Sequence, residues 1–290
     1  SGLVGSEMCI RDRSSPALVP ALPRALPDAR LRQWRRSAGR PLRALLFPLA
    51  LLLVWFWAAQ AKLLPEQILP SPVYVWQASL DAIQSGDLLM HIGWSAWRVA
   101  AGFGIGASLG LSLGLAMGLW PRLDDYVRPT FTAISQVPTL GWIPLLMLFL
   151  GIGETLKIVI IAKAAFIPVV LNTCSAIRSI PSSYFEVARM LRFTALQRLR
   201  LVILPAAVAP VFTGIRYGLT KAWTALVAVE LLAAAQGLGF LLVWSRQMFW
   251  LDMMLFAMIV IGLVGFLMDY GLARVESRLQ RWRLDPQAGA

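Results

Sequence analysis

The sequence predicts an all-α polytopic membrane protein with six transmembrane helices, and three observations lead to this fold class. Of its 290 residues, 58% are hydrophobic and 14% are charged, and the mean hydropathy is +0.67, which is typical of multi-pass membrane proteins rather than soluble domains. Apolar stretches recur along the chain at about the 20 residues that a helix needs to cross a bilayer. The net charge of +12 does not indicate nucleic-acid binding, because the basic residues cluster between and outside these stretches.

Two segments precede the first apolar stretch. The first thirteen residues, SGLVGSEMCIRDR, share no pattern with the rest of the chain and are interpreted as a non-native leader, which removes Cys9 from consideration. Residues 14–43 are rich in proline and arginine and poor in apolar residues, so we expect a disordered, basic cytoplasmic tail. The two cysteines, Cys9 and Cys174, show no disulfide or metal-binding spacing, and we predict no metal site.

Six apolar stretches form a predicted membrane domain over residues 44–276, with a cytoplasmic tail at 277–290. The candidate spans are residues 44–61, 99–120, 130–150, 155–174, 208–234 and 253–273. An even number of spans leaves both termini on one side of the membrane. Arginine is concentrated in both tails and in the 120–128 and 173–204 loops, and loops of this kind face the cytoplasm. Both termini are therefore predicted to be cytoplasmic.

The segments predicted on the outer side are short and contain residues suited to the membrane interface. Residues 64–91 contain three prolines, at positions 65, 70 and 72. They continue as an amphipathic stretch that we expect to lie along the outer surface. His91 is expected to be a solvated residue before the second span. Residues 235–252 are expected to form a short loop with Gly237 and Gly239 in a tight turn. Three aromatic residues of this loop suit the interface: Trp244, Phe249 and Trp250.

The second span carries a glycine at every fourth residue. The glycines of this stripe are Gly102, Gly106, Gly110, Gly114 and Gly118. On a helix this spacing removes the side chains from one face, so another helix can approach closely. The stripe therefore predicts tight helix packing.

The third span is interrupted by Pro138 and Pro144 around Gly141. A broken helix exposes backbone groups, which is tolerated in a membrane only inside protein or beside a wet cavity. Gln136 and Thr139 flank the break and are candidates for the permeation path. A purely structural kink is an equal alternative.

Several charged residues lie inside the predicted spans, where a charge at the bilayer centre costs about 2.5–3.5 kcal/mol and should face protein or water. Arg216 and Asp269 lie near cytoplasmic span ends and are expected to reach the surface. Lys221 either does the same or borders the permeation path. Glu230 is interpreted as a structural ion pair or interface residue in preference to a substrate contact. Its pairing with Lys163 is a hypothesis.

A basic, amphipathic segment, PSSYFEVARMLRFTALQRLRLVILP, interrupts the apolar pattern at residues 181–205. Ser183 precedes Glu186 by three residues, and Thr194 precedes Gln197 by three, which is the spacing of a capping box at the start of a helix. We predict two short cytoplasmic helices with a kink between them that dock a partner. The arginines in or beside the segment are Arg178, Arg189, Arg192, Arg198 and Arg200.

The same segment resembles the EAA motif of ATP-binding-cassette importer permeases, whose pattern is Glu-Ala-Ala, glycine at the seventh place and Ile-x-Leu-Pro at the end. Here the motif stands as Glu186-Val187-Ala188, with Arg192 at the seventh place and Val202-Ile203-Leu204-Pro205 at the end. Arg192 is the main departure. Glycine there would permit a left-handed turn, which costs other residues about 1–2 kcal/mol.

Similarity to the nitrate/sulfonate/taurine-type branch of these permeases extends over residues 42–283. The stretches that carry it are LPSPVYVWQA (69–78), WRVAAGFGIGASLGLSLGLAMG (97–118), LFLGIGETLKI (148–158), IPVVLNT (167–173) and AWTALVAVELLAAAQGLGFLL (222–242). The resemblance implies the MetI-like fold of type I importers and a bacterial plasma membrane location. It also implies import of a small, sulfonate-, taurine- or nitrate-like solute by alternating access.

The resemblance further implies the partners: a second copy of the permease, two cytoplasmic ATPase subunits and an extracytoplasmic solute-binding protein. The EAA helices would seat in a groove of the ATPase, with Glu186 and Arg189 orienting the contact and apolar residues strengthening it. ATP and magnesium would be bound by the partner. This chain is predicted to be no enzyme and to bind no cofactor, because none of its four lysines follows a glycine and it therefore lacks a GxxxxGK[ST] phosphate loop.

Two other classes of protein fit the sequence less well. A stand-alone secondary transporter or channel would favour internal repeats, which the sequence does not show convincingly, and would leave the docking segment unexplained. An intramembrane hydrolase would need a nucleophile–base pair, for which the sequence offers no plausible residues.

Overall fold

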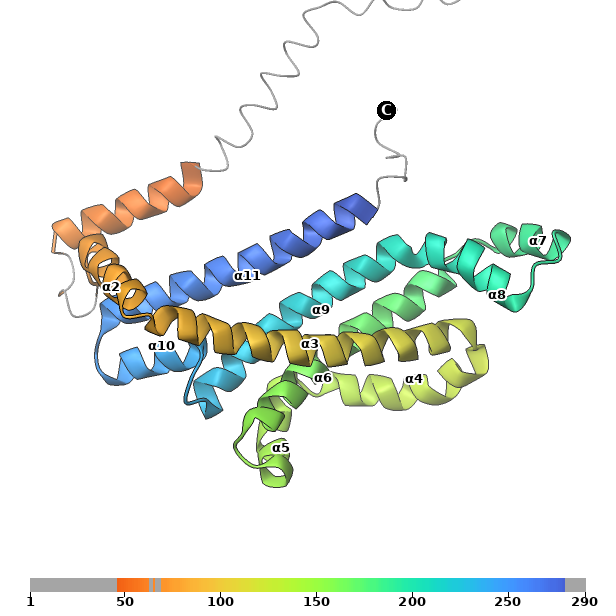
Figure 1. Cartoon of the computed structure of the whole chain (residues 1–290), viewed down its shortest axis with the longest axis horizontal. Helices are drawn as coiled ribbons and strands as arrows, with labels where there is room; N and C mark the ends of the chain where they lie inside the picture. The colour runs from red at the N-terminus through yellow and green to blue at the C-terminus, as the bar shows by residue number, and fades with distance from the viewer. Residues whose placement is uncertain (1–45, 63–64, 66–68, 280–290) are drawn as a thin grey trace, which may run out of the picture. The chain divides into compact units, whose positions relative to one another are not determined.

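The computed structural model describes residues 46–62, 65 and 69–279, and this part of the chain is almost entirely helical (Figure 1). The expected leader, the N-terminal tail and residues 280–290 of the C-terminal tail lie outside the described residues. The chain divides into two compact units, Ser1–Trp55 and Phe56–Ala290, and the helix Leu46–Gln60 contains the boundary between them.

The other described helices belong to the second unit. In chain order they are α2 (Pro72–Gln84), α3 (Asp87–Leu119), α4 (Pro121–Gln136), η1 (Thr139–Trp142), α5 (Ile143–Leu150), α6 (Glu154–Arg178), α7 (Ser182–Met190), α8 (Ala195–Arg198), η2 (Leu199–Ile203), α9 (Leu204–Ala233), α10 (Leu238–Gln247) and α11 (Leu251–Leu279). η1 is a 3-10 helix, and η2 is a π-helical segment that leads directly into α9.

Four helical stretches of the described chain are long and apolar enough to cross a membrane: α3, α6, α11 and the continuous run Ala195–Ala233, which contains α9. A fifth candidate is the pair formed by α4 and Thr139–Leu150, whose two parts meet at 89°. The helix Leu46–Gln60 occupies the place of the first predicted span but is shorter than 18 residues. Five of the predicted spans therefore each coincide with one helix and the third coincides with a bent pair, while the number six stays a prediction.

The third predicted span is bent at the proline that the sequence indicated. α4 ends at Gln136, and Val137 is extended (φ −76°, ψ 117°), as the residue before a proline prefers to be. Pro138 is the residue directly before η1. Pro144 lies in the first turn of α5, where its missing N–H costs no hydrogen bond. The span also begins earlier than predicted, at Pro121 instead of residue 130.

The centre of the second unit is the packing of α6 against α3 and α9. A Cβ atom added at any of the five stripe glycines of α3 would lie closer than 3.0 Å to an atom of α6. At Gly106 that atom is the backbone carbonyl oxygen of Ala162, which cannot rotate away. The predicted tight packing is confirmed, and its partner is α6.

On the side predicted to be outer, the amphipathic helix is present as α2, but two other expectations are wrong. Residues 235–252 do not form a short loop, because α10 occupies most of them. α10 starts directly after Gly237 (φ 118°), and Phe249 forms a left-handed turn (φ 58°) beyond its end. His91 is buried inside α3, which begins well before the predicted residue 99, and its Nδ1 accepts a hydrogen bond from the Gly237 N–H (3.0 Å).

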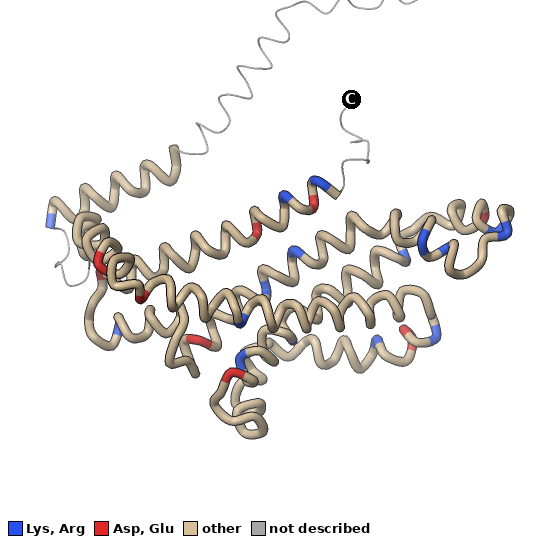
Figure 2. The backbone as a smooth tube through the Cα atoms, viewed as in Figure 1, with Lys and Arg blue, Asp and Glu red and all other residues tan. Residues whose placement is uncertain are grey.

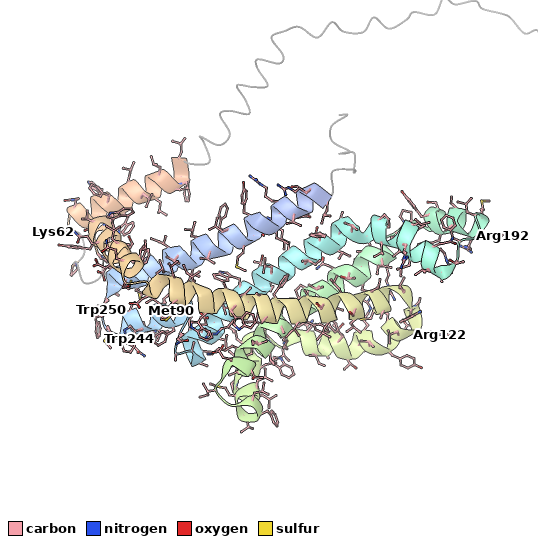
Figure 3. The ribbon with its side chains drawn as sticks, viewed as in Figure 1. Lys62, Met90, Arg122, Arg192, Trp244 and Trp250 are labelled. Atoms are coloured by element: carbon pink, nitrogen blue, oxygen red, sulfur yellow. The ribbon has the colours of Figure 1, made fainter. Side chains whose placement is uncertain are left out.

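The two ends of the second unit differ in composition. Figure 2 shows lysine and arginine residues around α7 and α8 and at the start of α4. Arg122 and Arg192 lie at this end, whereas Trp244 and Trp250 lie at the opposite end together with Lys62 (Figure 3).

Candidate functional site

We call residues 181–205 the coupling segment, after the role that the sequence predicts for them. They contain two short helices, α7 and α8, as the sequence predicted. α8 begins at a complete capping box, in which the Gln197 N–H donates to Thr194 Oγ1 (3.3 Å) and the Thr194 N–H donates to Gln197 Oε1 (2.8 Å). The prediction of a second capping box, at Ser183 and Glu186, is wrong. α7 starts directly after Pro181, so Ser183 lies inside the helix and is not its cap.

Arg192 forms the turn between α7 and α8 in a left-handed conformation, with φ at 54°. The Phe193 N–H donates to the Ala188 carbonyl and the Arg192 N–H to the Arg189 carbonyl, each at 3.0 Å. This pair of bonds is the Schellman motif, which ends helices and commonly has glycine at the left-handed position. Arginine keeps that geometry here at a cost of about 1–2 kcal/mol. The departure from the family motif therefore changes the stability of the turn and leaves its shape intact.

The coupling segment presents an apolar surface with charges beside it. Val187 and Met190 are 55% and 85% exposed, whereas Ala188 is buried. Glu186 and Arg189 are exposed on the same helix. A shallow pocket of about 300 Å³ adjoins them, lined by Ser183, Tyr184, Val187, Ala188, Phe193 and Val202. Such a surface offers apolar contact area to a partner and charges that orient it.

The end of the motif lies in a helix, and one nearby arginine joins two helices. Leu204 and Pro205 lie where η2 passes into α9, inside the continuous helical run Ala195–Ala233, and Pro205 removes one backbone donor from that run. Arg178 pairs with the buried carboxylate of Asp124 at 2.8 Å, and Arg128 pairs with the same carboxylate at 2.7 Å. Arg178 thereby links α6 to α4 and is not part of the exposed docking surface.

A cavity of about 510 Å³ lies beside the broken helix. Its lining residues are Ser135, Val137, Pro138, Thr139, Leu140, Ala164, Ile167, Pro168, Leu171, Asn172, Tyr217, Lys221, Thr224 and Ala225. Of the candidates for the permeation path, Thr139 and Lys221 line this cavity. Gln136 is exposed at the end of α4, and its neighbour Ser135 contributes to the wall instead.

Lys163 borders a different crevice. Its Nζ lies 5.0 Å from the centroid of the Trp142 ring, and within the described part of the chain it forms no hydrogen bond. The other residues of this crevice are Phe131, Ile134, Trp142, Leu146, Val159, Phe166 and Ile167. The hypothesis that Lys163 pairs with Glu230 is wrong, because Glu230 binds another cation.

Glu230 lies in a buried polar network, in which its partner is Arg98 and each residue is 1% exposed. Arg98 Nη1 donates to Glu230 Oε1 at 2.7 Å, and Ser95 Oγ donates to the same carboxylate at 2.9 Å. The Gly239 N–H donates to Glu230 Oε2 at 2.9 Å, while the Leu238 N–H donates to Ser95 Oγ. The interpretation of Glu230 as a structural ion-pair residue agrees with these contacts.

Arg98 extends this network to α6 and to the turn before α10. Its Nε and Nη2 donate to the two carboxylate oxygens of Glu154 at 2.7 and 2.9 Å. Its Nη1 also donates to the Gln236 carbonyl at 2.6 Å. Lys157 Nζ donates to Glu154 at 2.7 Å. The network thus ties α3, α6, α9 and the start of α10 together.

Sequence reasoning missed Arg98, Ser95 and Glu154 as parts of this network. A signal was present, because Ser95 and Arg98 are three residues apart in α3 and share a face, as Glu154 and Lys157 do in α6. Which of these faces meets Glu230 depends on the packing of helices that are far apart in the sequence.

Another ion pair joins α9 to α11. Arg216 Nε and Nη2 donate to the two carboxylate oxygens of Asp269, each at 2.6 Å. The two side chains are 41% and 38% exposed, so this pairing agrees with the expectation that both residues reach the surface. Lys221, farther along α9, has no ion pair among the described residues, and its Nζ lies 5.2 Å from the centroid of the Tyr217 ring.

Comparisons with known proteins agree with this arrangement. Residues 106–281 match the family described as binding-protein-dependent transport system inner membrane component. The chain is 34% identical to the aliphatic sulfonates transport permease protein SsuC of Bacillus subtilis, over 89% of this chain and 95% of that protein. It is 32% identical to the taurine transport system permease protein TauC of Escherichia coli (88% and 95%) and 31% identical to the bicarbonate transport system permease protein CmpB of Synechococcus elongatus (88% and 93%).

The fold is similar to that of a solved transporter. The inward-facing MetNI methionine ABC transporter matches with a TM-score of 0.54 and 19% identity, over 63% of this chain and 93% of that chain. The fold defines a helical protein with several apolar helices that are long enough to cross a membrane. The chain belongs to the family of binding-protein-dependent transport system inner membrane components and is a permease subunit of an ABC importer. The predicted resemblance is confirmed.

Proposed function

We propose that this permease works as one of two copies in an importer that a separate cytoplasmic ATPase drives and an extracytoplasmic binding protein supplies. The ATPase would bind ATP and magnesium, and this chain would perform no catalysis. Both termini and the coupling segment would face the cytoplasm of a bacterium. The basic residues around α7 and α8 and at the start of α4 support this orientation, because cytoplasmic loops carry an excess of lysine and arginine (Figure 2).

The observation that carries the proposal is the geometry of the coupling segment. Its exposed apolar residues and the adjoining pocket form a surface that a protein partner can cover. The segment continues through η2 into α9 as one helical run, Ala195–Ala233, so a displacement of the segment is transmitted to helix α9. The residues that we assign to ATPase coupling are Glu186, Val187, Ala188, Arg189, Arg192, Leu204 and Pro205.

We further propose that the solute is a small anion and that its path passes the cavity beside the broken helix. Relatives of this chain are named for sulfonates, taurine and bicarbonate, all of which carry an anionic oxygen group. Thr139 and Lys221 would border the path, and Gln136 would lie at its rim. Lys163 and Glu230 would act in helix packing, because neither lines this cavity.

Co-purification of the complex with its ATPase tests the coupling surface. We expect Glu186→Lys to lower ATPase retention at least about tenfold, equivalent to about 1.4 kcal/mol, because the charge on the exposed face of α7 is reversed. Asp125→Lys is the matched control, since Asp125 is exposed on α4 and lies outside the segment. Equal retention by both variants, or solute uptake without any ATPase, would refute the proposal.

A further inference from the structure

We propose that Lys221 makes the cavity beside the broken helix selective for small oxyanions with one negative charge. This inference rests on the proposed function, in which the same cavity lies on the path of the solute. It adds the residue that sets charge selectivity and the number of charges that the site accepts.

The chemistry of the cavity wall is the first argument. Among the described residues, Lys221 is the only charged one that lines the cavity, and no carboxylate does. Thr139 and Tyr217 add hydroxyl donors to the wall, and Asn172 keeps a second amide N–H beyond the one that it donates to the Pro168 carbonyl. The hydroxyls of Ser135 and Thr224 donate to backbone carbonyls of their own helices. One ammonium group surrounded by neutral donors matches an oxyanion, which accepts hydrogen bonds at several oxygens and carries one charge.

The depth of Lys221 in the membrane is the second argument. At a rise of roughly 1.5 Å per residue, Lys221 lies about 18 Å from the Ala233 end of α9 and about 25 Å from the Leu204 end. Lys221 therefore lies near the middle of α9, farther from either end of the helix than a lysine side chain extends. Ionisable residues at this depth face protein or a water-filled cavity and mark the paths of ions and substrates.

The third argument is that no carboxylate of the described chain neutralises the charge of Lys221. The other α9 cation, Arg216, binds Asp269, and Arg98 binds Glu230 and Glu154. The ammonium group of Lys221 lies instead over the Tyr217 ring, which stabilises a cation without cancelling its charge. Its charge therefore remains available to a ligand.

The size of the cavity sets the class of ligand. A volume of about 510 Å³ lies within the range of pockets for small organic molecules. Ala164, Ile167 and Ala225 supply apolar wall beside the donors, so a short alkyl group attached to the oxyanion also fits. A single cation balances one negative charge and leaves the second charge of a dianion uncompensated.

Labelling of a cysteine inside the cavity tests the charge directly. Thr224 lines the cavity one turn from Lys221, so Thr224→Cys in a Cys9→Ser background serves as the reporter. The full-length permease in lipid nanodiscs would react with methanethiosulfonates that carry a sulfonate, a trimethylammonium or a neutral group. The quantity measured is the ratio of the anionic to the cationic reaction rate, which cancels any change in the reactivity of the thiol itself.

We expect Lys221→Gln to lower this ratio about tenfold and Lys221→Glu to invert the preference. Lys221→Arg should retain it, and millimolar methanesulfonate should slow labelling only where a cation is present at position 221. Lys163→Gln is the matched control, because Lys163 is an intramembrane lysine that does not line this cavity, and it should change the ratio less than about twofold. Cys174, which is 2% exposed, should stay unlabelled in every folded variant.

An equal ratio with Lys221 and with Lys221→Gln would overturn the inference, as would a reporter that the neutral reagent cannot reach. Neither result involves the ATPase, so the two proposals fail separately. If Glu186→Lys releases the ATPase while the ratio of labelling rates is the same in Lys221→Gln, only the charge-selective site is refuted. If the ratio of labelling rates falls in Lys221→Gln but the Glu186→Lys variant still retains the ATPase, only the coupling surface is refuted.

Discussion

Removing Arg98 from the buried network should destabilise the protein more than removing the charge of its partner Glu230. Arg98→Met leaves the Glu230 carboxylate buried with only the Ser95 hydroxyl and the Gly239 N–H as donors from the described chain. Breaking a buried ion pair by removing one partner typically costs about 3–5 kcal/mol. We therefore expect the free energy of unfolding of Arg98→Met to fall by that amount.

Glu230→Gln should be milder, because Arg98 keeps both hydrogen bonds to Glu154, whose side chain is 46% exposed and can be solvated. The glutamine oxygen can still accept from Ser95 or from the Gly239 N–H. The loss should be about 1–3 kcal/mol, the cost of weakening a hydrogen bond to a charged group. In Arg98→Met/Glu230→Gln the buried carboxylate is gone as well, so the double variant should lose no more than Arg98→Met alone.

The assay is a detergent-titrated unfolding curve in which the buried Cys174 thiol reports global opening. In a Cys9→Ser background, Cys174 reacts with a fluorogenic maleimide only when the packing of α3 and α4 against α6 is lost. The coupling free energy follows from the double-mutant cycle and should be at least about 1 kcal/mol. Equal losses in the two single variants that add in the double variant would refute the reasoning.

Three further predictions concern packing and strain. Gly106→Ala should abolish or sharply reduce the folded yield, since the new methyl group meets the backbone of α6, with a loss of about 3 kcal/mol or more. Arg192→Gly should raise the free energy of unfolding by up to about 1 kcal/mol, because glycine adopts the left-handed turn without strain. Lys163→Met should stabilise the protein by about 1–3 kcal/mol, because a buried amine that has no hydrogen-bond partner in the described chain is replaced by an apolar side chain.

Each of these predictions has a matched control, measured in the same unfolding assay. Gly104→Ala should be neutral or slightly stabilising, because nothing in the described chain lies within 4 Å of its Cβ position. Arg192→Ala should gain less than Arg192→Gly, since alanine keeps the left-handed strain. Lys157→Met is the control for Lys163→Met and should destabilise, because it removes a donor to Glu154. A reversed order within any pair would contradict the structural reason given for it.

The features that the sequence predicted correctly depend on local pattern. The apolar stretches coincide with helices because a helix in lipid satisfies its backbone hydrogen bonds within one continuous segment. The break at Pro138 and the capping box at Thr194 result from the chemistry of a few neighbouring residues. The glycine stripe of α3 indicated a close helix contact from its spacing alone, although not that α6 would make it.

The features that the sequence left open depend on which helices meet. Glu230 pairs with Arg98 instead of Lys163, and Arg216 pairs with Asp269, because the packing of α3, α9 and α11 brings together residues far apart in the chain. His91 and α10 were misjudged for the same reason, since the N–H groups at the start of α10 are satisfied by side chains of α3 and α9. The sequence by itself therefore determined the apolar helices, their interruptions, the two short helices of residues 181–205 and the family. Only the tertiary structure decided the partner of each buried charge, because that choice is made by contacts between helices and not by periodicity within one.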